Sequence, residues 1–223
     1  MSRITHHRIT HRIGSLFGAA LCLLLARAGA VTALDVLSET GVRGGLVVHL
    51  GCEVPATGSA HPGSLTVDLR ATPSYVVHGL STDDTAVAKV REYVRTRGAS
   101  GPVSVDGWNA GALPYVDNLV NLVVAHVLPA AGMQEIMRVL APDGVAYVHN
   151  GERWSKTVKP RPDTIDEWTH YLHGPGNNAV AHDTVVGPPK HYQWHGTPYW
   201  SHHHDNMSST SALVSANGRL FHI

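Results

Sequence analysis

Apolar runs and amphipathic segments alternate through the middle of the chain. Compact apolar runs bounded by glycine and proline are typical of buried strands, and the nearly continuous run at 118–127 is expected of a strand buried on both faces. The predicted strands are 46–50, 75–80, 103–105, 118–127 and 145–148, with a turn at 142–144 before the last.

Helical spacing appears between these strands. Residues 82–98 form the clearest case, with Thr82 or Asp83 as the N-cap and Gly98 at the end. Weaker helices are predicted at 34–45, 63–71 and 133–140. Strands that alternate with helices form βαβ units, so we expect an α/β fold: a Rossmann-like, doubly wound, mainly parallel sheet over residues 34–150.

The first 33 residues have the pattern of an export signal. A basic start with Arg3, Arg8 and Arg12 precedes an uncharged apolar stretch at 13–26, and small residues at 28–30 and 31–33 offer cleavage sites. The stretch is shorter than the ~20 residues of a spanning helix, and an uncleaved anchor is the alternative. We expect an exported protein, periplasmic or extracellular.

The character of the sequence changes after residue 150. Residues 151–205 are rich in Pro, Gly, His and Trp and show little periodicity, and their aromatic content favours an ordered linker over a disordered one. Asn217-Gly218 lies between two apolar runs and predicts a β-hairpin within 206–223. Nothing after this hairpin in the sequence is expected to bury it.

Charge and cysteine content exclude several classes of protein. Lys+Arg and Asp+Glu both total 17, so the formal net charge is zero and gives no electrostatic case for a nucleic-acid partner or for membrane binding beyond export. Because Cys22 lies in the predicted signal, Cys52 is alone in the mature chain and is expected to be a small buried residue.

Several segments resemble successive motifs of class I S-adenosylmethionine-dependent methyltransferases. They are VVHLGC, GSLTVDLRA, HGLST, NAGALPYVDNLVNLVVA and MQEIMRVLAPDGVAYV. The last is the most specific, since that family carries Glu-Ile-x-Arg-Val-Leu-x-Pro-Gly-Gly before its fifth strand. The resemblance covers about 46–148 and implies S-adenosylmethionine as the cofactor.

The family's glycine-rich loop is altered in this chain. Gly51 and Cys52 follow the first strand, Glu53 stands at the place of the second glycine, and residues 53–62 resemble an insertion before Gly63. The side chain and the longer loop are expected to crowd the methionine part of the cofactor.

Other cofactor positions depart from the family as well. The acid that ends the second strand corresponds to Ser81, with Asp83 as a nearby substitute, and the acid that contacts adenine corresponds to Asn109. Asn121 stands at a fourth position where the family often has Asp. The resemblance thus implies a retained fold with weakened cofactor binding. No catalytic residue is singled out.

The C-terminal part resembles another architecture. The segment 164–194 and the hairpin are similar to the linker and first propeller strands of large exported proteins of planctomycete-like bacteria. In those proteins a methyltransferase-like domain precedes a pyrroloquinoline-quinone-type β-propeller. The resemblance implies a truncated N-terminal part, with a propeller domain or a small molecule as its partner.

Two histidine-containing groups suggest metal ligands. His202, His203, His204 and Asp205 follow one another, but neighbours in a strand face opposite ways, so a polar turn is the favoured interpretation. Asp166 and His170 would share one face of a helix, where a capped helical turn is favoured. We therefore expect no metal site.

Two hypotheses remain open. One is an active methyltransferase with a modified loop. The other is a non-catalytic scaffold of an exported quinone-type propeller protein, and export favours it because S-adenosylmethionine is made and kept in the cytoplasm.

Overall fold

A computed structural model describes residues 31–185 and 212–222. The chain divides into a first unit, residues 1–160, and a second unit, residues 161–223, each described by itself. Nearly all of the predicted export signal, and the whole of the His202–Asp205 group, lie outside the described residues. No helix within the described ranges is long and apolar enough to cross a membrane.

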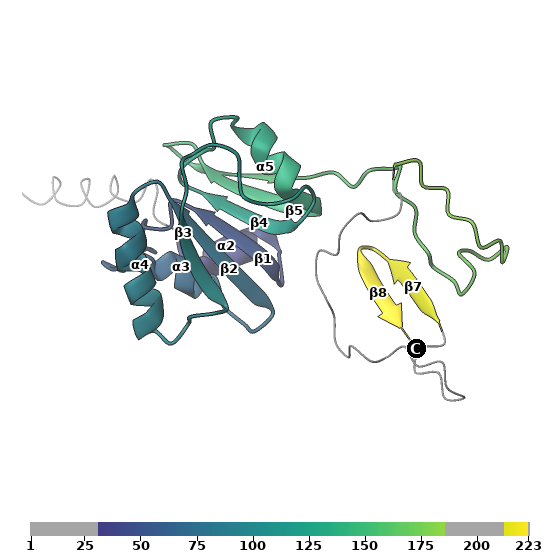
Figure 1. The fold of residues 1–223 in the computed structure, drawn as a ribbon, viewed down its shortest axis with the longest axis horizontal. Helices are drawn as coiled ribbons and strands as arrows, with labels where there is room; N and C mark the ends of the chain where they lie inside the picture. The colour runs from purple at the N-terminus through teal and green to yellow at the C-terminus, as the bar shows by residue number, and fades with distance from the viewer. Residues whose placement is uncertain (1–30, 186–211, 223) are drawn as a thin grey trace, which may run out of the picture. The chain divides into compact units, whose positions relative to one another are not determined.

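The first unit is built on a six-stranded sheet in the order β3-β2-β1-β4-β5-β6 (Figure 1). The first five strands are parallel and β6 is antiparallel to β5. This order is that of the doubly wound Rossmann fold. The strands are β1 (Gly45–Leu50), β2 (Tyr75–Ser81), β3 (Val103–Gly107), β4 (Val120–Ala125), β5 (Leu140–His149) and β6 (Trp154–Val158).

Helices cover both faces of this sheet, as Figure 1 shows. One apolar core joins the sheet to α2 (Ala33–Thr40), α3 (Ser64–Asp68) and α4 (Asp84–Thr96). The other joins it to α5 (Met133–Val139). Successive side chains of β1 point to opposite faces of the sheet, so Val47 belongs to the first core and Val48 to the second.

Helix ends follow the capping signals of the sequence. Asp83 caps α4 by accepting the Thr85 N–H at 2.8 Å, which decides between the two predicted caps. Thr32 and Asp35 form a reciprocal capping box at the start of α2, and Gly41 ends that helix with φ 73°.

The predicted turn at 142–144 is a bulge inside β5. Val120 pairs with Leu140 and Leu122 pairs with Val145, so four residues of β5 stand opposite one residue of β4. Asp143 has φ 64°, and its N–H donates to the Lys159 carbonyl at 3.0 Å. The Pro-Asp-Gly sequence therefore bends a continuous strand, because the neighbouring chain supplies the hydrogen bonds that a turn would make locally.

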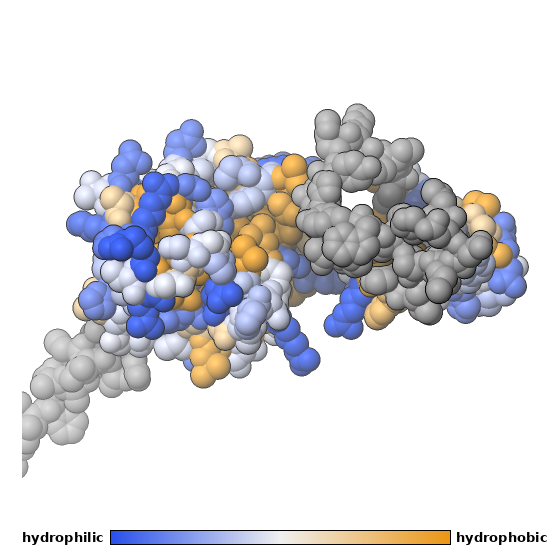
Figure 2. Space-filling view, turned by 60° about the horizontal axis from the view of Figure 1, so that its bottom comes forward, coloured by the Kyte–Doolittle hydropathy of each residue, from blue (hydrophilic) through white to orange (hydrophobic). Residues whose placement is uncertain are grey.

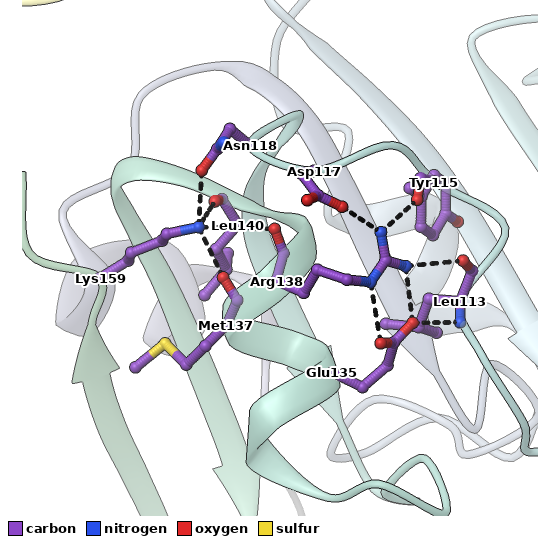
Figure 3. A network of polar contacts seen from close by, with 9 residues as sticks. All are labelled: Leu113, Tyr115, Asp117, Asn118, Glu135, Met137, Arg138, Leu140 and Lys159. Carbon is purple, nitrogen blue, oxygen red and sulfur yellow. Dashed lines mark hydrogen bonds and ion pairs between the residues drawn. The ribbon is translucent and has the colours of Figure 1, made fainter. Parts of the chain in front are cut away.

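The sheet extends past residue 150 into the segment that the sequence suggests is irregular. Strand β6 pairs with β5 from His149–Trp154 to Val145–Val158. Just after it, Lys159 Nζ donates to the carbonyls of Met137 and Leu140 at 2.6 and 2.7 Å (Figure 3). These carbonyls end α5, so a cation sits where the helix dipole favours one.

The second unit contains the predicted hairpin, formed by β7 (Leu213–Ala216) and β8 (Arg219–His222). Asn217 and Gly218 have φ values of 50° and 70°, as a type I′ turn requires. Trp168 lies beside β7: its N–H donates to Ser215 Oγ at 3.0 Å, and its carbonyl accepts the Ser215 N–H at 2.7 Å.

Candidate functional site

An open doubly wound sheet binds its ligands at its carboxyl edge, where the strand order reverses. That point lies between β1 and β4. The two strand ends approach each other closely: the His126 N–H donates to the Leu50 carbonyl at 2.9 Å, and a Cβ added to Gly51 would lie 3.1 Å from the Cβ of His126. We call this approach the Gly51–His126 contact. It continues the β1–β4 ladder to the carboxyl edge and leaves little room for a side chain at residue 51.

The loop after β1 folds onto β2. The N–H groups of Gly51 and Cys52 both donate to the Leu80 carbonyl, at 2.9 and 3.1 Å. Cys52 is completely buried, and a Cβ added to Gly79 would lie 2.7 Å from the Cys52 Cβ. Burial, with the charge of Glu53, raises the pKa of the Cys52 thiol to about 12. Cys52 is therefore a packing residue, as predicted, and not a nucleophile.

Gly63 also serves packing. It precedes α3 with φ 82°, and a Cβ there would lie 2.5 Å from Cγ1 of Val90 in α4. A side chain would therefore force α3 and α4 apart. Glycine at this position is explained without a ligand.

Ser81, Asp83 and Asn109 follow or end neighbouring strands, and each is engaged locally. Ser81 Oγ accepts the Asp83 N–H at 3.1 Å, and Asp83 Oδ1 accepts the Thr85 N–H at 2.8 Å. Asn109 Oδ1 accepts the Gly111 N–H at 2.9 Å. The structure thus brings these predicted positions to one end of the sheet, where their oxygens support a helix cap and a turn.

Asn121, the fourth position where the family often has Asp, lies at the other end of the sheet. It is the second residue of β4, and its Oδ1 accepts the Leu46 N–H at 2.9 Å. Both residues lie at the amino ends of their strands, opposite the ligand-binding edge. Asn121 therefore holds the start of β1 against β4.

Two positions at this edge differ from what the resembled family's S-adenosylmethionine site contains. Oε2 of Glu53, directly after the Gly51–Cys52 loop, is buried without a hydrogen-bond partner among the described residues. A ligand bound there would have to pair with this carboxylate or displace it. Ser81 cannot accept two ribose hydroxyls as a carboxylate does.

A row of histidines at the same edge was missed by sequence reasoning. His49 lies in β1, His126 follows β4 and His149 ends β5. The centroid of the His126 ring lies 5.3 Å from that of His49 and 6.3 Å from that of His149. Trp154 of β6 continues the row, with its ring 4.9 Å from that of His126. The signal was a histidine at or just after the end of three predicted strands.

The inner histidines are neutral packing groups. Nε2 of both His49 and His126 is buried without a hydrogen-bond partner among the described residues. Burial, with a neighbouring imidazole, lowers the pKa of His49 to about 3 and that of His126 to about 4. With His149 they are not among the groups whose ligand atoms converge closely enough to hold an ion. The row fills the edge with aromatic rings.

The most extensive polar network explains the Glu and Arg of the EIMRVL motif (Figure 3). Arg138 makes a two-pronged contact with Glu135, at 2.9 and 2.6 Å, and an ion pair with Asp117 at 2.6 Å. It also donates to the carbonyls of Leu113 and Tyr115, and Glu135 accepts the Leu113 N–H at 2.6 Å. This network fixes the loop between β3 and β4, and its role is structural.

The surface of the described residues carries exposed apolar side chains. On the face shown in Figure 2, hydrophobic areas are separated by hydrophilic ones. Exposed apolar side chains near the carboxyl edge include Val127 and Leu128 in the loop after β4. Isolated apolar residues of this kind are normal on soluble domains.

In the second unit, the capped helical turn favoured for Asp166 and His170 is wrong. The structure has no helix between residues 161 and 185, so the two residues do not share a helical face. Asp166 instead contacts His173, whose Nε2 lies 2.6 Å from Asp166 Oδ2. The loop reverses direction between them and brings the seventh residue, not the fourth, to the carboxylate.

Comparisons with known proteins bear on the fold of the first unit. No family pattern and no curated protein matches the sequence. Solved structures that resemble it include an S-adenosylmethionine-dependent methyltransferase from Aquifex aeolicus, 18% identical over 58% of this chain and 70% of that one, with a TM-score of 0.45.

Another is a putative S-adenosylmethionine-dependent methyltransferase from Methanococcus maripaludis, 17% identical over 52% of each chain, with a TM-score of 0.44. A third is the [4+2]-cyclase SpnF, 25% identical over 52% of this chain and 42% of that one, with a TM-score of 0.44. The chain spans about half the length of the first structures that it matches. At this level of similarity they do not indicate an activity. The strand order and the helices on both faces make residues 33–158 a Rossmann-like α/β domain.

Proposed function

We propose that the first unit is a methyltransferase-like domain that has lost or weakened S-adenosylmethionine binding. In this proposal it serves as a non-catalytic scaffold in an exported protein. The methyltransferase ancestry is supported by the motif resemblance across residues 46–148 and by the Rossmann strand order. Fold and ancestry alone do not assign an activity.

The altered loop after β1 and the serine that ends β2 carry this proposal. Glu53 stands where the resembled family has its second glycine, and its Oε2 is buried without a hydrogen-bond partner among the described residues. The loop from Gly51 to Cys52 is tied to β2 by two hydrogen bonds to one carbonyl. Moving this loop to admit a ligand would break those hydrogen bonds, which costs free energy that the ligand would have to offset.

The second unit supports the scaffold part of the proposal. Leu220 and Phe221 on β8 are 63% and 49% exposed. An isolated hairpin is marginally stable, so apolar side chains in this position favour further antiparallel strands as their covering. A β-propeller blade provides such strands. We therefore propose a β-propeller domain as the partner.

Calorimetric titration of the full chain with S-adenosylmethionine, and separately with S-adenosylhomocysteine, tests the binding part. We expect no saturable heat and no rise in melting temperature at millimolar ligand. A competent site would gain about 2.7 kcal/mol of stability at a hundredfold excess of ligand over Kd, so binding would be readily seen. Saturable binding of either ligand by the wild-type chain at micromolar concentration, as a competent site would give, overturns the proposal.

The variant Glu53→Gly sharpens this test, because it places a glycine where the resembled family has its second glycine and removes the side chain expected to crowd the cofactor. Weak binding that appears only in Glu53→Gly supports a methyltransferase ancestry with a blocked site. The scaffold part is tested separately by sequencing the DNA beyond the codon for Ile223. Repeated propeller-like strands in frame support it, and their absence overturns it.

A further inference from the structure

Three potential metal ligands meet in the second unit. The ligand atoms of Asp166, His173 and His182 all lie within 4.8 Å of one another, and they form the one such group among residues 31–185 and 212–222. His173 Nε2 lies 2.6 Å from Asp166 Oδ2. The backbone N–H of His182 donates to the same oxygen at 2.7 Å, which brings residue 182 to the carboxylate across a gap of sixteen residues.

Two of these ligands are held in place before any ion arrives. Asp166 Oδ1 accepts the Glu167 N–H at 2.8 Å, and the Asp166 N–H donates to Asp183 Oδ1 at 2.6 Å. Trp168 packs its ring edge-on against His173 at 5.4 Å, and the His173 side chain is 13% exposed. Fixed ligands lose little conformational freedom when they bind an ion.

The chemistry of the three groups suits a transition metal. The Asp166 carboxylate accepts hydrogen bonds from the backbone N–H groups of His182 and Glu167 and from His173, an arrangement that suits an anionic ligand. Two imidazoles and one carboxylate form the donor set of many zinc and iron sites that keep a coordination position open. The side of His182 faces solvent, so an ion could enter there.

We propose that Asp166, His173 and His182 bind one divalent transition-metal ion of the Zn²⁺ type. Zinc ligands lie about 2.0–2.2 Å from the ion, so two ligand atoms of a tetrahedral site lie about 3.3–3.6 Å apart. Asp166 Oδ2 and His173 Nε2, now 2.6 Å apart, would separate by about 1 Å, and a pair near the upper limit of 4.8 Å would approach by slightly more. The exposed His182 can make that movement. His173 then holds its proton on Nδ1 and presents Nε2 to the ion in place of its hydrogen bond to Asp166.

The ion would stabilise the hairpin as well as the loop. It joins residue 166 to residue 182, and Trp168, two positions from Asp166, is hydrogen-bonded to Ser215 of β7. The site therefore supplies to the second unit a cross-link of the kind that small structures with few core residues need. This role is independent of whether the first unit binds S-adenosylmethionine.

The test is titration of the full chain with Zn²⁺ against a chromophoric chelator, and with Co²⁺ followed by its visible absorption. The variants are Asp166→Asn, His173→Gln and His182→Gln. The matched control is His170→Gln, an exposed histidine of the same segment. Because His202, His203 and His204 could also bind metal, a variant with all three changed to Gln is titrated in parallel.

We expect each ligand variant to lose one equivalent of ion and to weaken binding at that site at least tenfold. His170→Gln and the triple variant should keep it. We also expect Zn²⁺ to slow proteolysis between residues 170 and 185 in the wild type and not in Asp166→Asn. The proposal is overturned if Asp166→Asn keeps the equivalent, if the triple variant alone loses it, or if His170→Gln loses it equally.

Discussion

Nδ1 of His49 lies 2.8 Å from the hydroxyl oxygen of Thr66. That hydroxyl also lies 3.1 Å from the carbonyl oxygen of Cys52, which can only accept. Thr66 therefore gives its single proton to Cys52, and His49 must donate from Nδ1. This chain of two hydrogen bonds fixes the tautomer of a completely buried histidine and ties β1, α3 and the loop between them together.

Thr66→Val keeps the shape of the side chain and removes its hydroxyl. It leaves the His49 Nδ1–H and the Cys52 carbonyl without partners in the core, which we expect to cost about 2–4 kcal/mol of the free energy of unfolding. Urea denaturation measures this change in the free energy of unfolding. Thr57→Val, at an exposed position of the same loop, is the control and should change stability by less than about 0.5 kcal/mol. Equal effects of the two variants would contradict the assignment.

The histidine row predicts a loss of stability in mild acid. An unfolded histidine has a pKa of about 6.5, whereas burial lowers the pKa to about 3 in folded His49 and to about 4 in folded His126. Between these values the unfolded chain binds more protons, so the free energy of unfolding falls as the pH drops from 6.5 toward 4.

Urea midpoints at pH 7.5 and pH 5 measure this loss. His49→Gln should reduce the difference between the two midpoints, because one of the depressed pKa values is removed. The exposed His61, changed to Gln, serves as the control and should leave the difference as in the wild type. A wild-type protein with equal midpoints at the two pH values would show that the row is hydrated and not buried.

Arg138 and Arg95 offer a matched comparison, since each pairs with a glutamate three residues earlier. Arg138→Met leaves Glu135, which is 8% exposed, without its cation and frees the loop carbonyls, so we expect a loss of about 1–3 kcal/mol. Arg95→Met removes a pair on the exposed face of α4 and should cost about 0.5 kcal/mol or less. Chemical denaturation distinguishes them, and similar losses would assign the network no special role.

Export, if it occurs, constrains where the signal is removed. Thr32 caps α2, Val31 is buried, and the Thr57 N–H donates to the Val31 carbonyl at 3.0 Å. Cleavage after Ala33 would remove all three contacts, whereas cleavage after Ala30 keeps them. N-terminal sequencing of exported protein should therefore begin at Val31. A start at Leu34 with unchanged melting temperature would contradict the importance of the cap.

Local sequence signals were sufficient for most of the first unit. The runs around Val47 and Val77 predicted buried strands, and Asp83 predicted a helix cap, because short-range patterning decides these features. The bulge at 142–144 was not predictable, since its hydrogen bonds come from Lys159, sixteen residues later. Strand β6 was missed because its exposed face is polar and it lacks an apolar run.

The candidate sites depended more on tertiary structure. The positions of Gly51, Ser81 and Asn109 followed from strand ends, but the Gly51–His126 contact joins residues that sequence spacing does not relate. Asp166 and His173 meet because the chain reverses its direction with His173 at φ 70°. A positive φ is uncommon for a residue other than glycine, so the sequence did not predict this turn.

The two edge strands of the sheet, β3 and β6, carry charged side chains. Lys156 lies on β6 and reaches the Glu39 carbonyl at 2.9 Å, and Asp106 on β3 is paired with Arg91 and His78. Charged side chains on edge strands disfavour the addition of a strand from another molecule. These charges therefore act against edge-to-edge self-association, a hazard for any open sheet.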